Sequence, residues 1–134
     1  MKISSKGRYA VRVMAELGKN PEISMSVAEL SQKQGITIKY LEKIISLLSK
    51  AKLIEGFRGS QGGYRLLKSP KEYSIAEILK ATDDLPELAP CMNTQEKCPR
   101  LNMCDSIGCW EKLNSIITDY LKKVSLKDLI DKKF

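Results

Sequence analysis

Four cysteines between positions 91 and 109 are the residues of this sequence best suited to chemistry. Cys91, Cys98, Cys104 and Cys109 are separated by six, five and four residues. In a chain without an apolar signal segment, clustered cysteines indicate metal or redox chemistry before structural disulfides. Thiolates are the usual ligands of iron–sulfur clusters, and they also hold structural zinc.

The spacing leaves several uses of these cysteines open. Structural zinc sites more often contain pairs with only two to four residues between ligands, and no such pair opens this set. The looser spacing suits an iron–sulfur cluster. The alternative is a structural zinc site or a regulatory disulfide, and buried apolar cysteines are a further interpretation that suits one cysteine better than four.

The sequence lacks the residues and motifs that most enzymes use for catalysis. The chain has no histidine, which removes the commonest general base and the commonest metal ligand. It has no glycine-rich phosphate loop and no G-x-S-x-G nucleophile motif. We therefore expect a protein that is not an enzyme.

The positive charge of the chain lies in its first half. Residues 1–68 hold 13 Lys/Arg and 5 Asp/Glu, whereas residues 69–134 hold 10 and 11, so the net charge of +7 comes from the first half. This asymmetry indicates a basic module that binds a polyanion, joined to a near-neutral module. No apolar run approaches the roughly 18 residues that span a bilayer. We expect a soluble, cytoplasmic protein without a membrane partner.

Helical periodicity and capping signals place the elements around these groups. Helices are expected at residues 9–18, 26–34, 37–50, 74–81 and 105–124, with a last short helix after residue 125. Capping boxes open the second and fourth of these at Ser26 and Ser74, and Gly35 ends the second. The second and third helices form a helix-turn-helix, and a glycine-rich hairpin at residues 53–66 is typical of a wing.

The expected fold class is mainly α with a small β-wing. Residues 1–81 would form a winged helix-turn-helix DNA-binding domain, residues 82–104 a cysteine-bearing loop, and residues 105–134 a long C-terminal helix followed by a short one. Two apolar stripes are expected to bury a helix face. The stripe of the third helix is Ile38, Leu41, Ile44, Ile45 and Leu48, and that of the long helix is Trp110, Leu113, Ile117, Tyr120 and Val124.

In a helix-turn-helix, the second helix enters the major groove of DNA. The candidate contact residues at its start are Thr37, Lys39, Tyr40, Glu42 and Lys43. Lysines there can contact phosphates or guanine edges, and a carboxylate can accept from the amino group of cytosine. Alternatively, Glu42 is a surface charge paired with Lys39 or Lys43.

The wing carries a second set of candidate DNA contacts at Arg58, Gly59, Ser60 and Gln61. Glycine lets the backbone approach a sugar–phosphate wall, and arginine suits a narrow minor groove. An ordinary hairpin turn is the alternative interpretation. A basic wing that follows a basic helix-turn-helix favours DNA binding.

Four segments carry a resemblance to a known family: residues 1–11, 34–36, 40–42 and 58–64. They closely resemble the IscR-like winged-helix transcriptional regulators, the superfamily of IscR, NsrR and CymR. The resemblance covers essentially the whole chain, and Cys91, Cys98 and Cys104 match the cluster-binding branch. It implies a homodimer built through the long helix, a palindromic operator in double-stranded DNA, and regulation by iron–sulfur cluster status or redox stress.

The chain departs from this family at the fourth cluster ligand. The family histidine, three residues after the third cysteine, is replaced by Ile107, and the acidic residue that other relatives recruit corresponds to Arg8. Cys109 is then the candidate ligand and Asp105 the alternative. Five residues is about 140° around a helix, so Cys104 and Cys109 converge only if Cys104 precedes the helix. A [2Fe–2S] cluster is favoured over [4Fe–4S], although all-cysteine ligation allows both and an isolated apo form can lack the cluster.

Overall fold

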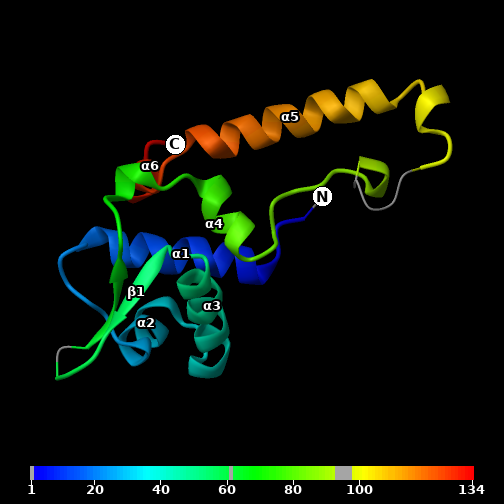
Figure 1. Ribbon diagram of the computed structural model, residues 1–134. Coiled ribbons are helices and arrows are strands. Elements are labelled where there is room, and N and C mark those ends of the chain that lie inside the picture. The colour runs from blue at the N-terminus through cyan, green and yellow to red at the C-terminus, as the bar shows by residue number, and fades with distance from the viewer. Residues whose placement is uncertain (1, 61, 93–97) are drawn as a thin grey trace.

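The structure, a computed structural model, describes residues 2–60, 62–92 and 98–134 (Figure 1). Its elements are α1 (Ser5–Lys19), α2 (Val27–Gln34), α3 (Ile38–Lys50), β1 (Ile54–Phe57), β2 (Gly63–Leu66), α4 (Ile75–Ala81), α5 (Ile107–Lys123) and α6 (Leu126–Ile130). Short 3₁₀ turns lie at Pro70–Glu72, Pro90–Met92 and Leu101–Met103. The predicted fold class is confirmed: a mainly helical chain has a helix-turn-helix, a hairpin wing and a long C-terminal helix.

One face of α1 forms the centre of the hydrophobic core. Ala10, Val13, Met14 and Leu17 are each 0% exposed, and their spacing of three and four residues places them on one side of the helix. α1 contacts α2, α3, α4, α6 and β2. Leu126 of α6 is also 0% exposed in the same core, so the C-terminal end of the chain returns to pack on the first helix.

α1 begins four residues earlier than the periodicity predicts. The hydroxyl of Ser4 caps the helix by accepting from the N–H of Gly7 at 3.1 Å. The carboxylate of Asp84 accepts from the N–H of Ser4 at 2.8 Å. The first turn has no apolar stripe, so its stability comes from this cap and from a carboxylate 80 positions away in the sequence.

The helix-turn-helix forms as the local signals predict. In the capping box of α2, Ser26 accepts from the N–H of Glu29 at 3.1 Å, and Glu29 accepts from the N–H of Ser26 at 3.0 Å. Gly35 ends α2 with φ +63°, a left-handed conformation that glycine adopts without steric cost. Thr37 then caps α3 by accepting from the N–H of Tyr40 at 3.3 Å. These caps fix where the second helix of the motif starts.

The wing is an antiparallel hairpin attached to the segment before α2. β1 and β2 pair Ile54 with Leu66 and Phe57 with Gly63. The N–H of Met25 donates to the carbonyl of Tyr64 at 2.9 Å, and the N–H of Tyr64 donates back at 2.7 Å. A side chain at Gly63 would overlap the carbonyl of Met25, so only glycine permits this close approach.

A buried tyrosine joins the wing to the base of the fold. Tyr73 is 0% exposed, and its hydroxyl donates to the carbonyl of Leu53 at 2.8 Å. The same oxygen accepts from the N–H groups of Leu67 and Lys68, each at 3.0 Å. Burial raises the pKa of Tyr73, so the phenol keeps the proton that it donates.

A nearly buried carboxylate joins α1 to α2. Glu16 is 8% exposed and accepts from the ammonium groups of Lys19 at 2.8 Å and Lys33 at 3.3 Å. It also accepts from the side-chain amide of Gln34 at 2.9 Å. The hydrogen bond from Lys19, supported by Lys33, lowers the pKa of Glu16 against the opposing effect of burial.

We expect Glu16→Gln to lower the free energy of unfolding by about 1–3 kcal/mol at neutral pH, because the variant removes two charge-assisted hydrogen bonds. Folding lowers the pKa of Glu16, so its contribution is complete above the ordinary value of 4.5 and disappears as the pH falls through the lowered value. Urea unfolding of both proteins at neutral pH and in acid measures this difference. A difference that stays constant in acid contradicts the assignment, and Glu22→Gln in the exposed loop is the control.

Candidate nucleic-acid interface and cysteine segment

The outward face of α3 presents the polar residues that the sequence predicts there. Lys39, Glu42 and Lys43 are exposed, and the exposed Ser46 continues the same face by one further turn. Thr37 is exposed at the start of the helix, where its hydroxyl caps α3. α3 therefore offers cations, a carboxylate and hydroxyl groups on one surface.

Ile38 corrects the predicted apolar stripe of α3. Leu41, Ile44, Ile45 and Leu48 are at most 3% exposed, as predicted, but Ile38 is 50% exposed. It occupies the first position of α3 and lies at the edge of the stripe, next to the exposed Lys39 and Glu42. The periodicity alone could not reveal whether a residue at this edge would be covered.

Tyr40 is half-buried and packs toward α1 rather than lying among the exposed lysines. Its ring meets the ring of Tyr9 edge-to-face, with centroids 5.9 Å apart. The guanidinium of Arg12 lies 5.2 Å from the centroid of Tyr9. Arg12 also donates to the side-chain oxygen of Gln34 at 3.0 Å and to the backbone carbonyl of the same residue. The ring contact joins α3 to α1, and the hydrogen bonds of Arg12 join α1 to the end of α2.

Glu42 is not neutralised by its neighbours on the helix. Within the part of the chain that the structure describes, no ion pair joins Glu42 to Lys39 or Lys43. The surface-pair alternative is therefore not what the structure contains. The carboxylate faces solvent and is available as an acceptor.

Lys6 is a basic residue of this surface that the sequence pattern did not indicate. It reaches from the first turn of α1 to line a shallow depression together with Lys39, Glu42 and Lys43. The predicted start of α1 left Lys6 outside the helix and more than 30 positions from α3. Its place in the basic N-terminal segment is the sequence feature that could have indicated this role.

The wing presents Arg58 at its tip. Arg58, Gly59 and Ser60 are exposed, while Gln61 lies outside the described residues. The other arginine of the hairpin, Arg65, lies over the ring of Phe57 at 3.9 Å and 3.8 Å from a carboxylate oxygen of Glu55. Arg65 therefore stiffens the hairpin, whereas Arg58 faces outward.

The four cysteines lie on the segment between α4 and α5 and at the start of α5. Cys91 lies in the Pro90–Met92 turn, Cys104 follows the Leu101–Met103 turn, and Cys109 lies in the first turns of α5. All four are free thiols; Cys91, Cys98 and Cys104 are half-buried and Cys109 is exposed. Outside residues 1, 61 and 93–97, no three potential metal ligands are gathered into one site.

Cys104 and Cys109 can converge only if Cys104 precedes the long helix, and Cys104 does precede α5. Its sulfur lies 3.3 Å from the hydroxyl of Ser106. The hydrogen bond to this hydroxyl, followed by those from the N–H groups of Ser106 and Ile107, lowers the pKa of the Cys104 thiol. Such an environment favours the thiolate, the form that binds metals.

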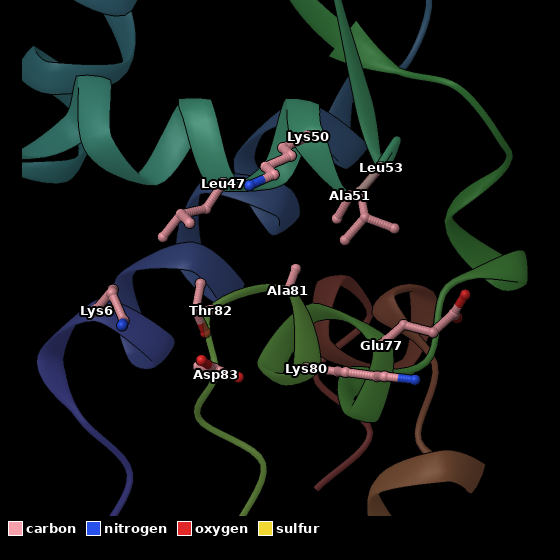
Figure 2. A pocket seen from close by; sticks show the side chains of 10 residues that line it. All are labelled: Lys6, Leu47, Lys50, Ala51, Leu53, Glu77, Lys80, Ala81, Thr82 and Asp83. Atoms are coloured by element: carbon pink, nitrogen blue, oxygen red, sulfur yellow. The ribbon is translucent and has the colours of Figure 1, made fainter.

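The start of the cysteine segment is attached to the helix-turn-helix body. Thr82 is 1% exposed, and Thr82 and Asp83 share a hollow with Lys6 of α1 and Leu47 of α3, as Figure 2 shows. The neighbouring Asp84 bonds to the N-terminus of α1. None of the predicted cysteine or DNA-contact residues lines this hollow, which instead marks where three helices and the segment meet.

Residues 3–132 match the Rrf2 family, which is described as an iron-dependent transcriptional regulator. The chain belongs to the Rrf2 family. It is 34% identical over 134 residues to the HTH-type transcriptional regulator IscR of Pectobacterium carotovorum, covering 99% of this chain and 81% of that relative. This bears out the predicted family resemblance.

Solved structures of Rrf2-like proteins share the fold. T. potens IscR superposes with a TM-score of 0.79 at 27% identity, over 100% of this chain and 89% of that one. CymR (YrzC), the global cysteine regulator of B. subtilis, also gives 0.79 at 27% identity, over 98% of each chain. The similarity therefore extends through the cysteine segment and α5, not only through the winged helix.

The Rrf2 membership makes this protein a DNA-binding transcriptional regulator rather than an enzyme. The exposed face of α3 carries Lys39 and Lys43 and the wing tip carries Arg58, cations of the kind that DNA backbone contacts need. Across the described residues, none of the helices is both long and apolar enough to cross a bilayer.

We expect Lys43→Ala and Arg58→Ala each to weaken binding of the Rrf2-family chain to its operator. Removal of one phosphate contact should also reduce the slope of log affinity against log salt by about 0.9. Fluorescence anisotropy at a series of salt concentrations measures both quantities. Lys71→Ala, in the exposed turn before α4, is the control. Wild-type affinity together with a wild-type slope in both variants would place the DNA on another surface.

Proposed function

We propose that this Rrf2-family regulator is a homodimer that binds a palindromic operator in double-stranded DNA through α3 and the wing. We further propose that its cysteine segment holds an iron–sulfur cluster whose presence controls that binding. The observation that carries the proposal is the combination of features found on α5. This one helix combines an uncovered apolar stripe with a cysteine, Cys109, in its first turns and another, Cys104, just before it, at the end that lies farthest from the body (Figure 1).

α5 has the surface expected of a dimerisation helix. Its 17 residues span about 26 Å. None of them is buried. Trp110, Leu113 and Tyr120 of the predicted stripe, and Ile116 beside them, are between 41% and 56% exposed. Ile117 and Val124, the other members of the predicted stripe, are half-buried. Apolar stripes of this length are rarely left in water by a monomer. A second copy of α5 is the occupant that matches the stripe, and the resulting two-fold symmetry matches a palindromic operator with half-sites about one DNA turn apart.

We expect Leu113→Glu to convert the dimer into a monomer, because a charge placed in an apolar interface costs about 2–5 kcal/mol per copy in reduced burial and desolvation. Ser115→Glu adds the same charge to the polar face of the same helix and serves as the matched control. Analytical ultracentrifugation measures the association constant. Equal association constants for the two variants would rule out this face as the interface.

The donor set fits an iron–sulfur cluster by its chemistry. Four thiols lie on one segment, none is used in a disulfide, and the local hydrogen bonds of Cys104 favour a thiolate. Cys91, Cys98 and Cys104 would supply three ligands, and Cys109 the fourth, with Asp105 as the alternative. Bound there, a cluster would supply one-electron redox chemistry and sensitivity to oxidants. A [2Fe–2S] cluster is favoured over [4Fe–4S].

The linker from α4 supports coupling between the cysteines and the DNA-binding surface. Asp84 bonds to the N-terminus of α1, and Thr82 is buried against the same body. α1 in turn contacts α3 directly through Tyr9 and Tyr40. Binding of a cluster by the cysteines would therefore act on the linker that is attached to α1, and on α5, which would set the spacing of two recognition helices.

Anaerobic reconstitution of the full chain with ferrous iron and sulfide tests the cluster. We expect a visible chromophore that disappears in Cys91→Ser, Cys98→Ser and Cys104→Ser, because each variant removes one ligand. Cys109→Ser should change the spectrum while Asp105→Asn should leave it unchanged. Absorption spectroscopy and metal analysis give the readout. A chain that binds zinc and develops no chromophore contradicts the proposal, and the reverse result for the last two variants would make Asp105 the fourth ligand.

A further inference from the structure

The first turn of α3 leaves one large apolar side chain in solvent. Ile38 is 50% exposed, although the other four members of its predicted stripe are buried. It is held in place at the first position of the helix, because Thr37 caps that turn through the N–H of Tyr40. Isoleucine is not a favoured residue for an exposed helix start, since its branched side chain loses rotamer freedom there. Half of the Ile38 side chain therefore remains available for an apolar contact outside the chain.

Helical geometry places Ile38 at the edge of the outward polar face, where that face adjoins the buried stripe. Residues at positions i, i+1, i+4, i+5 and i+8 share one side of a helix. Counted from Ile38, these are Lys39, Glu42, Lys43 and Ser46, and all of them are exposed. Ile38 and Glu42 are one turn apart and therefore neighbours. An apolar group and an exposed carboxylate therefore lie side by side at the end of α3 that would enter the groove.

The major groove offers one apolar group to such a surface, the C5 methyl of thymine. The carboxylate beside Ile38 suits the amino group of cytosine in the same groove. We propose that Ile38 is a specificity-determining residue that contacts the methyl group of a thymine in each half-site, next to the base pair that Glu42 contacts. This inference rests on the proposed use of α3 as the recognition helix, and it adds an apolar contact to that polar surface.

Replacement of thymine by uracil removes only the methyl group and leaves the hydrogen-bonding edge unchanged. A DNA duplex that the full-length chain binds is first selected from a random pool. Each thymine of this duplex is then replaced by uracil, one position at a time. Burial of one methyl group accounts for roughly fourfold in affinity, so one substitution per half-site should weaken wild-type binding by about fourfold, or about 16-fold in both half-sites. Ile38→Ala should bind thymine and uracil duplexes equally.

Two variants keep this test specific to Ile38. Thr37→Ser removes the other methyl group near the helix start but retains the capping hydroxyl, and it should keep the full uracil effect. Leu67→Ala removes an exposed apolar side chain beyond the base of the wing and should also keep it. Ile38→Ala changes an exposed helix residue to a better helix former, so its melting temperature should not fall.

The outcomes separate the inference from the proposed function. If the wild-type chain binds its selected duplex but no uracil substitution weakens binding, the result contradicts the proposed methyl contact. The proposed DNA-binding surface is unaffected by that result. A uracil effect that persists in Ile38→Ala, or that disappears only in Thr37→Ser, also overturns the role of Ile38. If no sequence is selected from the pool, the proposed operator binding fails, and the inference fails with it.

Discussion

The burial of one face of α1 is the constraint on which the rest of the structure depends. Ala10, Val13, Met14 and Leu17 place this helix at the centre of the core, and most of the body is attached to it. α2 is attached through the carboxylate of Glu16, and the C-terminal α6 through Leu126 and its neighbours. A displacement of α1 would therefore alter the orientation of the recognition helix.

The N-terminus of α1 is also the place where the cysteine segment joins the DNA-binding body. Asp84 accepts from the N–H of Ser4, and a side chain at Gly7 would overlap the carboxylate of Asp84. The same helical turn carries Lys6, which lies beside the exposed face of α3. The proposed DNA-binding surface and the linker from the cysteines thus meet within a single turn. If the cysteine segment holds a cluster as proposed, this arrangement provides a short physical route from that cluster to DNA affinity.

The features that the sequence predicts well are set by neighbouring residues. The capping boxes at Ser26 and Ser74, the left-handed Gly35 and the capping of α3 by Thr37 each depend on residues within a few positions. The features that it missed depend on distant residues. The early start of α1 depends on Asp84 in addition to the local cap at Ser4, the exposure of Ile38 depends on what packs against the edge of its stripe, and the approach of Lys6 to α3 depends on helix packing.

The cysteines fall between these two cases, because their types are evident in the sequence, whereas the proposed cluster would determine how they come together. In the proposed mechanism, α1 and α5 connect them to DNA binding. Operator affinity measured on one preparation, before and after anaerobic cluster reconstitution, tests that link most directly. We expect a change of about 5- to 150-fold, the usual range of allosteric coupling. Equal affinities, with the cluster verified by its absorption in the same sample, would contradict the link.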